Sequence, residues 1–175
     1  MRPRKPNPSD LMADPMSDAM LIELGRFITR WGFLESVVVN LLAGFLGTEP
    51  QLLFPITGDI QISTRLKHLR MLGKLRLLPE HFKILSRLAT QAEELCRFRN
   101  YLIHGLWNLL SANEDIVLVL ETRPSTKSAI TREIGQYCNV YYLKWLIGAV
   151  ARCMFLLHNF GVQFGIIEEK REIER

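Results

Sequence analysis

The recurrence of apolar residues at intervals of three and four positions constrains the fold of this chain more than any other feature. It runs through four segments, residues 17–46, 63–78, 79–104 and 131–164. Because one face of an α-helix repeats at this interval, each segment is predicted to be a helix. The first three are expected to bury one side, whereas the last is apolar on most of its surface and is expected to make contacts on two sides. Ser17 is typical of the residue that caps the start of a helix, and Gly47 of the residue that follows its end.

The stretch before the last predicted helix has a different pattern. Leu106–Leu110 and Ile116–Glu121 are rich in β-forming residues, and the polar segment 111–115 separates them. This arrangement predicts a short β-hairpin. Residues 47–59, which contain two prolines, are expected to form a loop. The predicted fold class is all-α: an antiparallel up-and-down bundle of four main helices, with the hairpin inserted before the last helix.

The chain is expected to form one domain, because 175 residues suit a single core. Apolar residues make up 48% of it, enough to bury that core, so disorder is expected only at the ends. Residues 1–15 contain four prolines and are predicted to be a flexible leader. Residues 168–175 are mostly charged and are predicted to be a solvated tail, which leaves 16–167 as the helical domain.

Neither a signal peptide nor a membrane span is expected. The start of the chain is polar and lacks the apolar centre of a signal peptide. The apolar stretches 33–47 and 141–167 are interrupted by polar and charged residues, among them Glu35 and Arg152. The three cysteines have no disulfide or metal-ligand spacing and are interpreted as buried thiols of a reducing compartment. A cytoplasmic protein without a metal or a cofactor is therefore predicted.

The segment Arg99-Asn100-Tyr101-Leu102-Ile103-His104 could carry chemistry. Arg99 stands where the apolar stripe of its helix predicts a leucine, and a buried guanidinium is costly unless it is paired or lines a wet cleft. Asn100 and His104 are four residues apart, hence on one helix face. Arg99 and His104 are separated by about 140° of rotation, so their side chains converge only across a cleft or if the last turn loosens.

An arginine, an asparagine and a histidine together suit phosphodiester chemistry. The guanidinium of Arg99 can bind a phosphate and stabilise charge that develops on its oxygens. The imidazole of His104 can transfer a proton near neutral pH. A structural interpretation stays open on spacing alone: Arg99 would pair with a buried carboxylate, and His104 would bind carbonyl groups at the helix end.

Two further residues are candidates for a supporting role. Glu35 interrupts the apolar face of the first predicted helix. Its carboxylate needs a partner, and it would either hold Arg99 in position or pair with Arg97 or Arg30. Tyr101 could stack on a nucleobase, although an aromatic residue beside an apolar stripe more often belongs to the core.

Basic residues gather on the second predicted helix. Lys67, Arg70 and Lys74 are spaced at i, i+3 and i+7 and so share a face. Such a face can follow the phosphates of a nucleic acid, and its binding would then depend on salt. The plain alternative is a solvated helix surface. The net charge of +4 permits an acidic partner without requiring one.

The segment Arg99–Trp107, with the sequence RNYLIHGLW, resembles the motif of the HEPN superfamily as it occurs in small stand-alone bacterial members. The motif has an arginine, an asparagine directly after it, and a histidine five positions after the arginine, near the end of a long helix. The predicted helical architecture of residues 17–165 is similar as well. The resemblance implies a metal-independent endoribonuclease of the toxin or defence type.

The resemblance also implies residue roles and partners. Arg99 would position the scissile phosphate of RNA, and His104 would assist attack by the 2′-hydroxyl or protonate the leaving oxygen. Asn100 would orient the motif or contact the substrate. A homodimer would bring two motifs to one cleft, and the largely apolar last helix independently suggests a second subunit. An antitoxin protein is a further expected partner. Leu106 stands where some of these toxins carry a modified tyrosine, so that form of regulation is not expected.

Two other functions compete with the ribonuclease. Many members of the superfamily have lost activity, so a catalytically inactive module that binds RNA, a nucleotide or a protein is the first alternative. The second is a purely structural helical protein without a role in nucleic-acid binding.

Overall fold

The structure is a computed structural model that describes residues 16–58, 60–104, 106–109, 117–124 and 131–167, with the backbone alone described for the strands up to residue 137. The described part is mostly helical, which confirms the predicted class at this level. Its elements in chain order are α1 (Asp18–Leu46), α2 (Pro50–Thr57), α3 (Ile62–Arg76), α4 (Pro79–His104), β1 (Leu106–Leu109), β2 (Val117–Pro124), β3 (Thr131–Cys138) and α5 (Val140–Gln163). The predicted leader and charged tail lie outside these residues.

Both predicted limits of α1 are confirmed. The Ser17 hydroxyl accepts a hydrogen bond from the backbone N–H of Met20 at 3.4 Å. Gly47 ends the helix with φ of 65°, a conformation that glycine adopts without steric cost, and its N–H donates to the carbonyls of Ala43 and Gly44. Pro79 is the first residue of α4, where its missing N–H costs no helical hydrogen bond.

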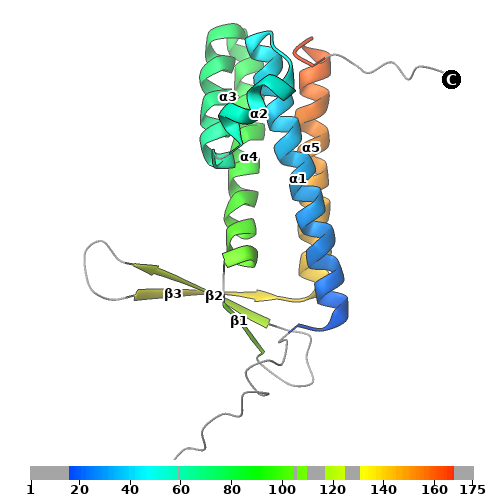
Figure 1. Cartoon of the computed structure of the whole chain (residues 1–175), viewed down its shortest axis with the longest axis vertical. Helices are drawn as coiled ribbons and strands as arrows, with labels where there is room; N and C mark the ends of the chain where they lie inside the picture. Colours follow the sequence, from blue (N-terminus) through cyan, green and yellow to red (C-terminus); the bar gives the residue numbers. More distant parts are fainter. Residues whose placement is uncertain (1–15, 59, 105, 110–116, 125–130, 168–175) are drawn as a thin grey trace, which may run out of the picture.

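The four long helices enclose the core. The helix α1 packs against α3 and α5, and α4 packs against the same two helices (Figure 1). The apolar stripes meet inside, and the largest fully buried side chains of the described residues come from all four helices: Phe27, Met20, Leu34, Leu41, Leu66, Leu69, Leu85, Leu143, Leu146, Leu157 and Val38. Burying each leucine stabilises the fold by about 1.5–3 kcal/mol.

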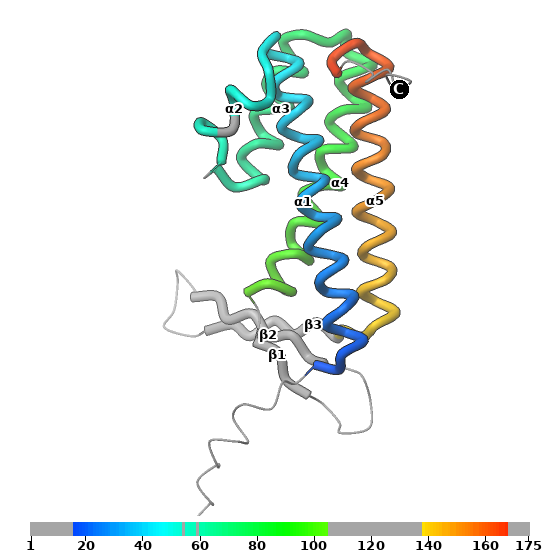
Figure 2. Tube along the Cα trace, turned by 45° about the vertical axis from the view of Figure 1, so that its right-hand side comes forward, coloured from blue at the N-terminus to red at the C-terminus, as the bar shows by residue number. Residues whose placement is uncertain are grey.

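The predicted up-and-down order of the helices is wrong. The carbonyl of Ile166, just after α5, lies against Gly44 near the end of α1, so α1 and α5 run in the same direction. The ring of His81 at the start of α4 lies 4.3 Å from that of Phe164 after α5, so α4 runs the opposite way. A tight turn joins α3 to α4, and α3 therefore runs parallel to α1 (Figure 2).

The short helix α2 explains this departure. It occupies most of the 47–59 segment that was predicted to be a loop, despite Pro55 within it. The axis of α2 is bent by 102° from that of α1, and the chain returns to mid-height of the bundle before α3 begins (Figure 2). The prolines misled the loop prediction because Pro50 stands at the first helical position, where proline is tolerated.

The three strands form an antiparallel sheet in the order β1-β2-β3 at the end of the bundle where α4 ends (Figure 1). Leu106 is opposite Leu120, and Val117 is opposite Cys138. The turn of the predicted hairpin, residues 110–116, lies outside the described residues, so the hairpin itself stays a prediction.

The start of the last helix was predicted wrongly. Residues 131–138 pair with β2 as β3, and α5 begins at Val140, not at Thr131. Gly135 disfavours a helix here, and β2 supplies a partner for the backbone hydrogen bonds of this segment. Asn139 caps α5, because its side-chain oxygen accepts from the N–H of Tyr142 at 2.8 Å.

The helix α5 is apolar beyond the face that it buries. Tyr141, Trp145 and Phe155 are exposed, although α5 packs on α1 and α4. By length and composition alone α5 also meets the requirement for a membrane span. The expected absence of a membrane and the cytoplasmic location therefore remain predictions.

Candidate active site at the end of α4

The motif residues lie in the last two turns of α4, which stays helical through His104. Nη1 of Arg99 donates to the side-chain oxygen of Asn100 at 3.3 Å and lies 3.3 Å from Nε2 of His104. Arg99 and Asn100 are half-buried, and His104 is exposed. The long arginine side chain thus covers the rotation between positions 99 and 104 without any loosening of the helix, and the structure brings the three motif side chains together.

The contact between Arg99 and His104 has a definite hydrogen-bond chemistry. A guanidinium only donates, so in a hydrogen bond between these two groups Nε2 of His104 is the acceptor. Charge-assisted hydrogen bonds from nitrogen to oxygen are usually about 2.7–2.9 Å long. The 3.3 Å contacts of Arg99 are longer and therefore weaker, so an anionic ligand could replace them.

No carboxylate pairs with Arg99 among the described residues. The ion pairs there join Arg26 to Glu23 and Arg70 to Glu93. The structural interpretation of Arg99 required a buried carboxylate beside it, and the described part of the chain supplies none. Within the described residues, the side-chain contacts of its guanidinium are with the amide of Asn100 and the imidazole of His104.

The motif side chains line a solvent-open cleft of about 740 Å³, called the motif cleft below. Its walls come from α4, from the start of α3 with the preceding connection, and from α1. The polar and charged residues that line it are Glu35, Gln61, Ser63, Arg65, Lys67, Glu93, Arg97, Arg99, Asn100 and His104. Four of these residues are lysines or arginines, so the cleft offers several cations to an anionic ligand.

Glu35 lines the motif cleft, but among the described residues it does not form the predicted ion pair with an arginine. Its Oε1 accepts from the indole N–H of Trp31 at 2.8 Å, and no ion pair joins it to Arg99, Arg97 or Arg30 in that part of the chain. The reason is local, because Trp31 lies one helical turn before Glu35 and can donate without leaving the core. Tyr101 is half-buried and does not line the cleft.

The predicted basic face is divided by the structure. Lys67 is exposed and lines the motif cleft, whereas Arg70 and Lys74 do not line it. Arg70 binds Glu93 at 2.5 Å and the hydroxyl of Thr90 at 2.9 Å across the α3–α4 contact. Equal spacing on one helix face could not reveal this, because the partner of Arg70 lies on another helix.

Sequence reasoning did not place Arg65 or Arg97 in the site. Arg65 is 7% exposed, and its guanidinium donates to the carbonyls of Thr57 at 2.7 Å and Gly58 at 3.1 Å. It thereby satisfies the end of α2 and fixes the connection that walls the cleft. Arg97 is exposed and lines the cleft. Two positions on a helix correspond to about 200° of rotation, so the spacing of Arg97 and Arg99 gave no signal that both line one cleft.

The pKa of Cys96 is affected by both positive and negative charges near the motif cleft. Burial raises the pKa of its thiol, the charge of Arg99 lowers it, and the carboxylates of Glu35 and Glu93 raise it. Opposite charges thus gather around one half-buried side chain. In the described part of the chain, no group of three or more histidine, cysteine, aspartate or glutamate side chains could hold a metal ion.

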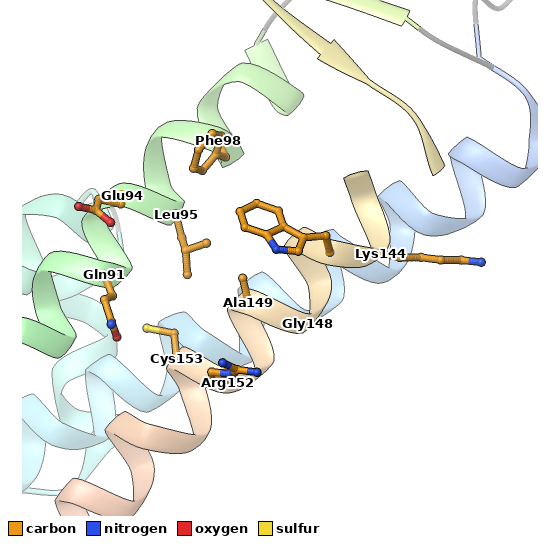
Figure 3. A pocket seen from close by; sticks show the side chains of 10 residues that line it. Gln91, Glu94, Leu95, Phe98, Lys144, Gly148, Ala149, Arg152 and Cys153 are labelled. Atoms are coloured by element: carbon orange, nitrogen blue, oxygen red, sulfur yellow. The ribbon is translucent and has the colours of Figure 1, made fainter. Parts of the chain in front are cut away.

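A second cavity, of about 480 Å³, lies between α4 and α5 (Figure 3). Phe98 and Trp145 face each other edge to face across it, with ring centres 6.4 Å apart, and Leu95 and Ala149 also line it. Arg99, Asn100 and His104 do not line this cavity. It is therefore a separate feature, lined by apolar side chains together with the polar side chains of Gln91, Glu94, Lys144 and Arg152.

Comparison of the chain with protein-family models, with curated protein sequences and with solved structures finds no match in any of the three. The resemblance to the HEPN superfamily therefore rests on the motif itself.

Proposed function

We propose that this chain is a HEPN-type, metal-independent endoribonuclease whose site is the motif cleft. One observation carries the proposal: Arg99 and His104 meet at 3.3 Å at a solvent-open cleft, and no described carboxylate neutralises the arginine. A guanidinium held beside an imidazole is suited to bind a phosphate and to move a proton next to it.

In the proposed reaction the 2′-hydroxyl of RNA attacks the adjacent phosphorus and the bond to the 5′-oxygen of the next nucleotide breaks. The products are a 2′,3′-cyclic phosphate and a 5′-hydroxyl. Arg99 binds the non-bridging oxygens, where negative charge grows in the transition state. His104 either removes the proton of the 2′-hydroxyl or supplies one to the leaving oxygen, and Asn100 holds the guanidinium in place.

We also propose that the active form is a homodimer. A single chain provides one histidine at the motif, whereas cleavage benefits from both an acid and a base. The exposed Tyr141, Trp145 and Phe155 on α5 offer an apolar surface for a second subunit. Light scattering at micromolar concentration tests this: a dimer is expected, Trp145→Glu should weaken it, and a monomeric mass for the unaltered protein would contradict it.

The ribonuclease proposal is tested with single-stranded RNA of mixed sequence in excess EDTA. Cleavage that leaves cyclic phosphate ends is expected, and His104→Ala should lower its rate by about 100- to 10,000-fold. His158→Ala is the matched control, because His158 is exposed on α5 and does not line the motif cleft. Binding of RNA without cleavage by the unaltered protein would instead support the inactive binding module.

A further inference from the structure

A third cavity, of about 510 Å³, adjoins the motif cleft and is open to solvent. It lies between α1 and α2, and its polar lining includes Ser36, Asn40 and Gln51; it is called the amide cavity below. Glu35, Gly58 and Arg65 line both the amide cavity and the motif cleft. A ligand that spans more than one chemical group can therefore occupy both.

The amide groups of this cavity are uncommitted within the described part of the chain. Neither Asn40 nor Gln51 uses its side chain in a hydrogen bond there, and both are accessible, Asn40 half-buried and Gln51 exposed. An amide carries both a donor and an acceptor and so matches the edge of a nucleobase. Ser36 differs, because its hydroxyl already donates to the carbonyl of Gly32 at 3.0 Å.

Charge is distributed unevenly over the two cavities. Lys67, Arg97 and Arg99 line only the motif cleft, as does Glu93, whose carboxylate binds Arg70. Glu35 and Arg65 line both cavities, and the guanidinium of Arg65 donates to backbone carbonyls. A phosphate is attracted to the first region and repelled by Glu35. A nucleotide has the same polarity, with an anionic phosphate at one end and a neutral base at the other.

Glu35 is held as a hydrogen-bond acceptor. The indole N–H of Trp31 occupies its Oε1 and fixes the carboxylate, while Oε2 has no hydrogen bond within the described residues. An ionised carboxylate only accepts, so it favours bases that present an exocyclic amino group. Uracil has no amino group. Two carbonyl oxygens flank its single ring N–H, and a carboxylate that approaches this edge is repelled by both oxygens.

We propose that the amide cavity binds the nucleobase next to the scissile phosphate, and that Glu35 with Asn40 selects a base carrying an exocyclic amino group over uracil. This inference rests on the proposed ribonuclease function and adds a specificity site to it. Glu35 acts here on the base and takes no part in the transfer of protons during cleavage.

The test measures binding separately from cleavage. The His104→Ala protein is titrated into fluorescent oligocytidylate and oligouridylate of equal length, two pyrimidine polymers that differ in the exocyclic amino group. Oligocytidylate is expected to bind about tenfold more tightly, the discrimination that a well-placed pair of hydrogen bonds to a base provides. Equal affinities would overturn the proposal.

Two matched pairs of variants locate the effect, each made in the His104→Ala background and checked for folding by circular dichroism. Glu35→Gln should reduce the preference to about twofold by improving oligouridylate binding, because an amide can also donate. Glu49→Gln makes the same change at an exposed position that lines neither cavity and should leave the preference intact. The proposal would be overturned if both Glu35→Gln and Glu49→Gln lost the preference for oligocytidylate, or if neither lost it.

Asn40→Ala should weaken oligocytidylate binding by about tenfold, whereas Asn159→Ala, exposed on α5, should not change it. Equal effects of the two asparagine variants would contradict the site. Because these affinities need no cleavage, a protein that prefers oligocytidylate but never cleaves RNA would refute the ribonuclease alone. A protein that cleaves all sequences equally would refute only the amide cavity.

Discussion

The arginines of α3 and the arginine of the motif on α4 have opposite relations to the fold. Arg65 and Arg70 have short hydrogen bonds, to backbone carbonyls at 2.7 Å and to the carboxylate of Glu93 at 2.5 Å. Arg99 has two contacts of 3.3 Å and no carboxylate partner among the described residues. The first two guanidinium groups are therefore committed to holding elements together, whereas the third is available to a ligand.

The largest expected effect falls on Arg99. Arg99→Ala should lower the rate of RNA cleavage by about 100- to 1,000-fold, because the growing charge on the phosphate loses its donor. Its free energy of unfolding should fall by no more than about 1 kcal/mol, because the two 3.3 Å contacts of this half-buried side chain contribute little. Cleavage kinetics and urea denaturation measure the two quantities. A large loss of stability with normal cleavage would show that Arg99, like Arg65 and Arg70, serves the fold and does not bind RNA.

Arg65 should show the reverse behaviour. Arg65→Met keeps the aliphatic packing but leaves the carbonyls of Thr57 and Gly58 without their donor. The free energy of unfolding is expected to fall by about 1–3 kcal/mol, the usual cost of losing charge-assisted bonds at a buried site. Urea denaturation measures it, with Arg97→Met as the exposed control that should cost little. Equal losses in both variants would show that Arg65 does not fix this connection.

The pair formed by Arg70 and Glu93 is partly exposed, with 21% and 31% of the side-chain surface accessible. Solvent screening therefore limits its contribution, and a double-mutant cycle with Arg70→Ala and Glu93→Ala should give a coupling of less than about 1 kcal/mol. The measurement is the free energy of unfolding of all four proteins. Cleavage by Arg70→Ala should match that of the unaltered protein after correction for stability, and a specific loss of activity would assign Arg70 to RNA.

The smallest expected effect separates the lysines of α3. Lys67 lines the motif cleft and Lys74 does not, although both are exposed. Lys67→Ala should reduce the slope of log affinity against log salt by about 0.7, the value for one phosphate contact on a single strand. Lys74→Ala should leave the slope unchanged. RNA titrations of the His104→Ala protein over a range of salt concentrations test this. Equal slopes for both variants would instead support the prediction that Lys67 and Lys74 contact RNA from one shared basic face.

Local patterns explain why parts of the fold could be predicted. The ends of α1 and the start of α4 depend on Ser17, Gly47 and Pro79, whose capping preferences act within one turn of the chain. The start of α5 could not be predicted equally well, because residues 131–138 find their backbone partners in β2. A segment with weak helical preference takes the structure that its neighbours in space make available.

The candidate site divides in the same way. The motif at Arg99, Asn100 and His104 could be singled out because a guanidinium interrupts an apolar stripe near a helix end. Glu35, predicted as a supporting residue, does line the cleft, but its bond to Trp31 was not foreseen. Arg65 and Arg97 were not assigned to the site, since their relation to it depends on how α3 and the end of α4 meet.

The sequence by itself determined that the chain forms long amphipathic helices, where α1 begins and ends, and which side chains break the apolar pattern of α4. Only the tertiary structure decided the direction of the helices, the third strand and the partner of each charged side chain. The physical reason is range: capping and hydrophobic periodicity act over a few residues, whereas an ion pair or a strand ladder joins groups distant in the chain. Whether a cation serves the fold or remains available to a ligand depends on such contacts between groups that are distant in the chain.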